Sequence, residues 1–216
     1  SVELEATLAA KGKTQALDMV QQMMRNPGSV MYVRQQEPAG LGHAVWCARH
    51  LAQSEPVAVL LADDLILGTG CLGEMLSAYN GGNMVAVMDV PQNETASYGI
   101  VTPGADDGRI VEVNGLVEKP SPADAPSNIA VVGRYIIEPG VFTHLDRQEQ
   151  GAGGEIQLTD SLARQIGEVP FSGLRFSGER FDCGSKIGFL QANIAFALQR
   201  DELGQHLKSW LEERLK

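Results

Sequence analysis

The first strong signals in the chain are two apolar segments that lack polar alternation. Residues 57–61 form a continuous apolar run, and residues 84–90 are interrupted only by Asp89. Runs of this kind are typical of strands that are buried on both faces of a sheet. Helical segments are predicted at 43–51 and 71–79, before and between these strands. Alternating strands and helices indicate a parallel sheet with crossover helices.

The pattern on either side of this region is different. Residues 4–24 have helical periodicity with an interruption near Gly12, and the breakers at 26–28 end it. Further predicted elements are short strands at 30–33, 98–101, 110–113, 129–137 and 171–176, and helices at 139–145, 155–166 and 187–215. The strands between 98 and 137 follow one another without helices, which favours an antiparallel insertion. We therefore predict an α/β fold with a Rossmann-like mixed, mainly parallel sheet over residues 1–186, and a C-terminal helical tail over 187–216.

Composition narrows the class of protein. The formal net charge is −10, and an acidic chain is a poor candidate for non-specific nucleic-acid binding, which needs a basic surface. No apolar run reaches the length of a membrane span. The three cysteines are widely spaced and form no metal-ligand pattern, so we expect free thiols and a cytoplasmic protein. The chain begins with Ser1 inside an apparent helix, and we expect that an N-terminal portion is missing.

A glycine pattern at 68–73 offers one functional hypothesis. Its GxGxxG spacing follows a predicted strand and precedes a helix, and Asp89 lies near the end of the next strand. This is the arrangement of a dinucleotide site, in which glycines admit a pyrophosphate and an acid binds the ribose. Glycine is abundant, however, with 24 of 216 residues, so the pattern arises easily by chance. An NAD-binding oxidoreductase remains an alternative.

Acidic residues at strand ends offer a second hypothesis. Asp63 and Asp64 follow the apolar run 57–61, and Asp182 lies between a predicted strand and the last helices. Either position is also a common place for a turn or helix-capping acid. Open α/β sheets bind ligands beyond the carboxyl ends of their strands, and Mg²⁺ is held by one or two carboxylates and substrate phosphates. Asp63 and Asp182 are therefore candidate Mg²⁺ ligands.

Two further segments contain candidate binding groups. In the segment Glu118-Lys119-Pro120, an acid for sugar hydroxyls stands beside a lysine for a phosphate, although a solvated hairpin end would look the same. The glycine-rich segment 35–44 could place Gln35 at the edge of a flat base. An ordinary glycine turn is the alternative, and His43 is more typical of a structural histidine.

Seven blocks of sequence make a specific resemblance. They are QQEPAGLGHA, LLADDLI, SYGIV, VEKP, APSNIAVVGRYI, GAGGEIQLTD and RFDCGSK. In this order they resemble the bacterial UTP–glucose-1-phosphate uridylyltransferases, from residue 2 to about 210. The resemblance implies a nucleotide-diphospho-sugar transferase fold, Mg²⁺ as cofactor, and UTP, glucose 1-phosphate, UDP-glucose and pyrophosphate as substrates and products.

The resemblance also implies roles for single residues. Asp63 and Asp182 correspond to the metal-binding acids, and Lys119 and Asp63 to the catalytic positions, while Asp64 is less secure. The positions implied to bind substrate are Gln35 and Gly40 at the uracil, Gly99, Glu118 and Lys119 at the sugar and its phosphate, and Asn128 and Gly133 beside the glucose.

The sequence departs from the family pattern in one respect. The GxGTR-type loop and the PKE-type motif that hold the triphosphate do not occur in it. A homologue or fragment that binds a sugar nucleotide without turning over is therefore an alternative to the active enzyme. Family members form homo-oligomers, dimers or tetramers, and the tail from Ile187 is the predicted contact. No nucleic-acid or membrane partner is expected.

Overall fold

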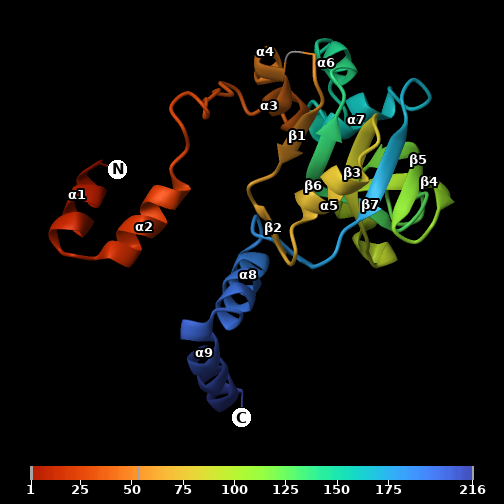
Figure 1. Cartoon of the computed structure of the whole chain (residues 1–216). Coiled ribbons are helices and arrows are strands. Elements are labelled where there is room, and N and C mark those ends of the chain that lie inside the picture. Colours follow the sequence, from red (N-terminus) through yellow and green to blue (C-terminus); the bar gives the residue numbers. More distant parts are fainter. Residues whose placement is uncertain (1, 53, 216) are drawn as a thin grey trace. The chain divides into compact units, whose positions relative to one another are not determined.

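The computed structural model describes residues 2–52 and 54–215, and the chain divides into two compact units between Arg34 and Gln35. The first unit contains helices α1 (Val2–Ala10) and α2 (Thr14–Met23), drawn in red in Figure 1. The predicted helical segment with its break near Gly12 is confirmed. The strand predicted at 30–33 is wrong: these residues form an exposed loop, because no neighbouring strand pairs with their backbone.

The second unit contains the sheets and the remaining helices (Figure 1). Its strands are β1 (Val57–Leu60), β2 (Asp64–Leu67), β3 (Asn83–Asp89), β4 (Gly99–Asp106), β5 (Ile110–Glu118), β6 (Ile129–Ile137), β7 (Phe171–Arg175) and β8 (Glu179–Asp182). Its α-helices are α3 (Leu41–Cys47), α4 (Arg49–Ala52), α5 (Cys71–Ala78), α6 (Gly140–Leu145), α7 (Leu158–Ala163), α8 (Lys186–Leu198) and α9 (Asp201–Arg214), with short 3₁₀ turns at Gln92–Ser97 and Ala152–Gly154.

Six strands form the main sheet in the order β1-β6-β3-β7-β5-β4. The mixed α/β fold is confirmed, but the expectation that the sheet is mainly parallel needs correction. Among the described strand pairs of this sheet, only β3 and β7 are parallel. β6 lies antiparallel between β1 and β3, so these two strands, which run in the same direction, are not neighbours. The sequence predicted antiparallel strands between 98 and 137, but an apolar run is the same in either direction and next to any neighbour, so it did not reveal that β6 lies between β1 and β3.

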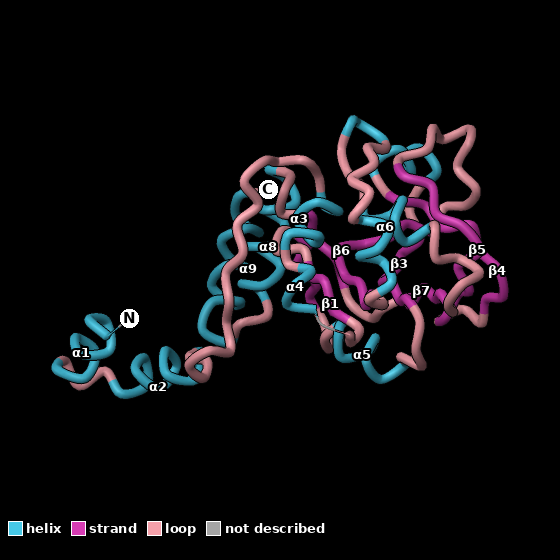
Figure 2. Tube along the Cα trace, turned by 90° about the horizontal axis from the view of Figure 1, so that it is seen from above, coloured by secondary structure: helices cyan, strands magenta, loops and turns pink. Residues whose placement is uncertain are grey.

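Side chains that alternate along β3 divide the core into two layers. Val85 and Val87 pack in a cluster with residues of α6 and α7, and α3 packs against the same cluster. Met84 and Ala86 point to the other face, where Met75 of α5 is fully buried. Figure 2 shows α5 on the opposite side of the strands from α3 and α6. Helices on both faces of the sheet explain why β3 is apolar along most of its length.

β2 and β8 form a separate two-stranded antiparallel sheet in which Asp64 is opposite Asp182. The N-terminus of α8 follows it directly, and the hydroxyl of Ser185 accepts a hydrogen bond from Gly188 N–H as an N-cap. Phe196 of α8 packs on Phe181 of β8 with 6.3 Å between ring centroids. The boundary predicted after residue 186 therefore falls inside the second unit. Within the described ranges, no helix is both long and apolar enough to span a bilayer.

Candidate active site

A cavity of about 270 Å³ lies between the main sheet and the β2–β8 sheet. The predicted residues Gly99, Glu118, Lys119, Gly133 and Asp182 all line it. They come from β4, β5, the turn after β5, β6 and β8, so the fold brings together residues that are far apart in the chain. The other lining residues are Leu41, Leu61, Asp64, Ser97, Tyr98, Val131, Tyr135, Glu155, Gln157, Leu158, Thr159 and Arg180.

Glu118 and Lys119 form the polar side of this cavity. Thr159 donates a hydrogen bond of 2.7 Å from its hydroxyl to Glu118 Oε2, which fixes the carboxylate. Lys119 Nζ lies 3.7 Å from Glu118 Oε1, and its side chain is 49% exposed whereas that of Glu118 is 11% exposed. The lysine therefore reaches toward solvent while the acid stays inside the site.

The backbone at Lys119 is strained. Its φ of 48° lies in the left-handed region, which costs about 1–2 kcal/mol for a residue with a side chain. The N–H of Lys119 donates a 2.9 Å hydrogen bond to the carbonyl of Tyr98, and this contact holds the turn. Strain of this kind occurs mainly where surrounding contacts fix a functional group.

Gly99 and Gly133 allow neighbouring side chains to approach the backbone closely. A Cβ on Gly99 would lie 2.9 Å from a methyl carbon of Thr159 and 3.1 Å from Glu118 Oε2. A Cβ on Gly133 would lie 2.2 Å from Asp64 Oδ2. Glycine at both positions thus lets Thr159, Glu118 and Asp64 pack directly against the backbone that lines the cavity.

Asp64 is engaged in a buried ion pair. Its Oδ1 accepts hydrogen bonds from Nε and Nη2 of Arg180, and its Oδ2 accepts one of 2.9 Å from Gly133 N–H. The side chains of Asp64 and Arg180 are only 7% and 12% exposed. Arg134 donates to the carbonyls of Leu61 and Asp64 at 3.0 and 2.6 Å. These contacts make Asp64 a structural acid that joins β2 to β6 and β8.

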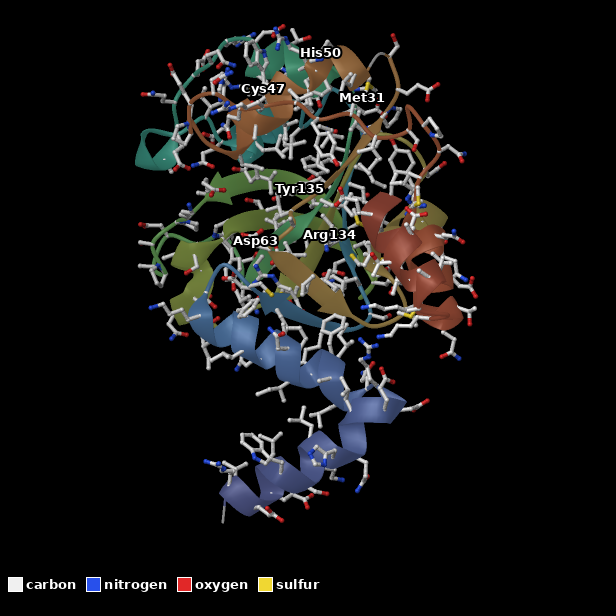
Figure 3. All side chains as sticks on the ribbon, turned by 90° about the vertical axis from the view of Figure 1, so that its left-hand side faces the viewer. Met31, Cys47, His50, Asp63, Arg134 and Tyr135 are labelled. Atoms are coloured by element: carbon white, nitrogen blue, oxygen red, sulfur yellow. The ribbon has the colours of Figure 1, made fainter. Side chains whose placement is uncertain are left out.

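Asp63 and Asp182 are both exposed, and Asp182 Oδ1 accepts a 2.9 Å hydrogen bond from Gly184 N–H. A Cβ on Gly184 would lie 3.0 Å from Asp182 Oδ1 and 3.2 Å from Asp63 Oδ2, so both acids flank the same glycine. Cys183 N–H also donates a 2.8 Å hydrogen bond to the carbonyl of Asp63. Figure 3 shows Asp63 in the same region as Arg134, apart from Cys47 and His50 on α3 and α4.

Two oxygen-bearing acids fit a Mg²⁺ ion that shares its ligands with substrate phosphates. Among the residues that the structure describes, no three His, Cys, Asp or Glu side chains form a closed metal cage. Asp63 lines a second hollow of about 850 Å³, which shares Leu41 and Leu61 with the first cavity. The two hollows therefore meet beside the acids.

Gln35 and Gly40 lie on the loop before α3, outside the lining of the 270 Å³ cavity. The side-chain amide of Gln35 donates to the Gly40 carbonyl at 3.1 Å and lies 2.9 Å from His43 Nδ1. Gly40 has a φ of 111°, and a Cβ there would lie 2.7 Å from the carbonyl oxygen of Ile156. The loop is thereby fixed against the segment that leads into α7.

Asn128 is not brought together with the other predicted residues. It is exposed, it does not line the cavity, and its carbonyl accepts a 2.9 Å hydrogen bond from Val90 N–H. In contrast, Tyr98, Thr159 and Arg180 line the cavity although sequence reasoning gave them no role. Each lies inside a block that carried the family resemblance, and that was the available signal.

Tyr135 closes the floor of the cavity. Burial raises the pKa of its phenol far above the usual value, and the nearby carboxylates of Glu118 and Asp64 raise it further. The neutral form of this phenol is therefore favoured in the folded protein.

The glycine pattern at 68–73 has a structural explanation. A Cβ on Gly68 would lie 3.0 Å from the Cα of Gly178, so the two glycines allow two backbones to approach closely. β2, which precedes the pattern, belongs to the two-stranded sheet. Asp89 accepts a hydrogen bond of 3.2 Å from Arg175 Nε. The acid expected to bind a ribose is thus already paired.

Comparison with known proteins identifies the family. A family model described as nucleotidyl transferase matches residues 7–197. The UTP–glucose-1-phosphate uridylyltransferase of Komagataeibacter xylinus is 50% identical over 190 residues, which are 87% of this chain and 67% of that protein.

Solved structures agree with this match. A UTP-bound UGPase from Acinetobacter baumannii has a TM-score of 0.88 and 36% identity, covering 99% of this chain and 75% of that one. A UDP-glucose pyrophosphorylase complexed with UDP-glucose has a TM-score of 0.75 and 38% identity, covering 79% of this chain and 66% of that one. The chain thus spans about two thirds to three quarters of the length of these relatives. It belongs to the nucleotidyl transferase family and, within it, to the bacterial UTP–glucose-1-phosphate uridylyltransferases.

Proposed function

We propose that this chain transfers a uridylyl group from UTP to glucose 1-phosphate, which yields UDP-glucose and pyrophosphate. The single observation that carries the proposal is that Glu118 at the end of β5, Lys119 in the turn after it and Asp182 of the small sheet line one cavity. The relatives whose names or structures mention UTP, glucose 1-phosphate and UDP-glucose support the choice of substrates.

The reaction requires positioning and charge neutralisation rather than a covalent catalyst. A phosphate oxygen of glucose 1-phosphate attacks the α-phosphorus of UTP. The new P–O bond forms as the bond from the α-phosphorus to the β-phosphate bridging oxygen breaks, and pyrophosphate leaves with that electron pair. Mg²⁺, when bound by Asp63 and Asp182, supplies neutralising charge for the phosphates.

The sugar side of the site follows from the contacts around Glu118. Its Oε2 is held by Thr159, and its Oε1 faces the region of Lys119, so the carboxylate can accept hydrogen bonds from glucose hydroxyls. The exposed ammonium group of Lys119 binds and orients the attacking phosphate. Gly99 and Gly133 lie in the wall of the cavity, and we assign Asn128 only a supporting place at the start of β6.

On the nucleotide side, we assign the uracil to the loop containing Gln35 and Gly40. This loop is fixed by the hydrogen bond from Gln35 to the Gly40 carbonyl and by the close approach of Gly40 to Ile156. A rigid loop binds a flat base with little loss of conformational entropy.

We also propose a homo-oligomer, a dimer or tetramer, formed through α8 and α9. Ile187, Phe189 and Leu190 at the start of α8 are more than half exposed, and Trp210 of α9 is also exposed. A contiguous apolar patch of this type is typical of a protein–protein contact. Light scattering at micromolar concentration tests the proposal. We expect the wild type to be a dimer or tetramer and Leu190→Glu to be a monomer. A monomeric wild type would contradict the proposal. The free thiols of Cys47, Cys71 and Cys183 support a cytoplasmic location.

A coupled pyrophosphate assay on the 216-residue chain, with UTP, glucose 1-phosphate and Mg²⁺, tests the transfer reaction. We expect the wild type to release pyrophosphate continuously and Asp63→Ala to release none. Near-normal release by Asp63→Ala would contradict the metal assignment.

The second candidate is a protein that binds sugar nucleotide without turnover. Calorimetric binding of UDP-glucose without pyrophosphate release would establish it, and calorimetry with NAD(H) would test the oxidoreductase alternative.

A further inference from the structure

Arg180 is an almost buried arginine that lies between the two sheets and lines the cavity of about 270 Å³. Its Nε and Nη2 both donate to Asp64 Oδ1, and its Nη1 donates to the phenol oxygen of Tyr98 at 3.2 Å. The guanidinium carbon also lies 5.4 Å from the centroid of the Tyr98 ring. One side chain therefore joins the small sheet to the segment that begins β4.

A backbone hydrogen bond links Tyr98 in turn to Lys119. The carbonyl of Tyr98 accepts the N–H of Lys119 at 2.9 Å, and this bond holds a residue whose φ is 48°. On the other side, Arg180 is two residues from Asp182 on the same strand, and Asp64 directly follows Asp63. A continuous series of contacts thus runs from the acids that flank Gly184 to the lysine of the sugar side.

The nature of the ion pair favours a positional role over a stabilising one. Taking an arginine and an aspartate out of water is costly, and buried pairs often contribute little net stability compared with apolar residues. What an arginine provides is a planar, rigid fork that can hold two partners at once in a fixed geometry. Here the two partners are Asp64 of the small sheet and Tyr98 of the main sheet.

We propose that Arg180 is a positioning residue that, through Tyr98, sets the location of Lys119 relative to Asp63 and Asp182. The proposal rests on the function proposed above and adds a coupling between the metal side and the sugar-phosphate side. Asp63 and Asp182 are both acidic, so the phosphates of a sugar nucleotide would reach them through Mg²⁺ and not directly. The spacing set by Arg180 should therefore matter for binding with Mg²⁺ and not for binding without it.

The test uses Tyr98→Phe in the full 216-residue chain. This change removes the phenol oxygen that Arg180 contacts, and it keeps the ring, the Tyr98 carbonyl and the pair between Arg180 and Asp64. The matched control is Tyr79→Phe, which removes a phenol that donates to the Gly82 carbonyl at 2.9 Å and to Glu138 at 3.0 Å, outside the cavity lining.

The readout is the dissociation constant of UDP-glucose, measured by calorimetry in Mg²⁺ and in EDTA. The coupling is the constant in EDTA divided by the constant in Mg²⁺. We expect Tyr98→Phe to lower this ratio by about fivefold to tenfold, the effect of one such hydrogen bond, while the constant in EDTA changes less than about twofold. Arg180→Lys, which keeps the charge and loses the fork, should lower the ratio in the same way. Thermal unfolding establishes that each variant is folded.

An unchanged ratio in folded Tyr98→Phe, or an equal decrease in Tyr79→Phe, would overturn the positioning role while leaving the proposed function intact. Absence of UDP-glucose binding by the wild type in both conditions is a separate outcome. It would contradict the proposed function and the positioning role together.

Discussion

The hydrogen bond from Thr159 to Glu118 gives a sharp test of the sugar side of the site. Thr159→Val removes the hydroxyl and keeps the shape of the side chain, so no cavity forms. In the native structure the hydroxyl donates to Glu118 Oε2 at 2.7 Å, the Glu118 side chain is 11% exposed and Thr159 is buried. Solvent can therefore replace the lost donor only in part.

The expected magnitude follows from this burial. A hydrogen bond to a charged group contributes about 1.5–3 kcal/mol, so we expect the free energy of unfolding to fall by about 2 kcal/mol. For a domain of this size such a loss lowers the Tm by about 4–8 °C. Because Glu118 is then free to turn, the affinity for UDP-glucose should fall by about tenfold.

Differential scanning calorimetry and titration calorimetry measure the two effects, with Thr159→Ser as the matched control. Serine keeps the hydroxyl, so it should retain most of the affinity even if it loses some packing. The reasoning would be refuted if Thr159→Val bound UDP-glucose as tightly as the wild type, or if Thr159→Ser lost as much affinity as Thr159→Val.

Three further predictions use other parts of the structure. Gly133→Ala should lower the free energy of unfolding by about 2–3 kcal/mol, because its Cβ would lie 2.2 Å from Asp64 Oδ2. Gly73→Ala in helix α5 should raise the free energy of unfolding by about 0.5–1 kcal/mol, because a Cβ there meets nothing within 4 Å and alanine favours a helix. Urea denaturation measures both changes. In Asp63→Asn, UDP-glucose should no longer raise the Tm in a Mg²⁺-dependent way, whereas Asp107→Asn, on the exposed β4–β5 turn, should keep this effect. Thermal shift assays with and without EDTA measure the difference. Burial raises the pKa of the Cys71 thiol from 9.0 to about 11, so the neutral thiol is favoured in the folded state. The contribution of this thiol to the free energy of unfolding is therefore fully present below pH 9 and is lost as the pH rises toward 11. Pulsed alkylation and mass spectrometry at pH 8 should accordingly modify Cys71 more slowly than Cys47 and Cys183, and equal rates would contradict this assignment.

Much of the local structure could be predicted because it depends on neighbouring residues. The apolar run 57–61 and the segment 84–90 predicted β1 and β3, and the breakers near Asn26 ended a helical segment as expected. Residues 30–33 show the limit of this reasoning. They have the composition of a strand, but a strand also needs a partner for its backbone, which no local pattern can supply.

Much of the site was also predictable, since its residues lie in blocks that resemble a family. The structure added the partners of those residues. Thr159 is 41 positions from Glu118, and no spacing rule connects a threonine at the start of one helix with an acid at the end of a strand. Likewise, the role of Arg180 depends on Tyr98, which lies 82 positions away.

Asp63 and Asp64 show most clearly what the sequence by itself determined and what only the tertiary structure decided. The sequence placed two chemically identical acids just after an apolar strand, and so located a candidate cation site at the sheet edge. Asp63 lies in the turn before β2 and Asp64 is the first residue of that strand, so the two acids meet different surroundings. Asp64 turns toward Arg180, which is 116 positions away, and forms a buried pair, while Asp63 remains exposed beside Gly184 and Asp182. The division of roles was decided by the tertiary structure, because the arginine that neutralises one acid reaches it only when β8 folds against β2.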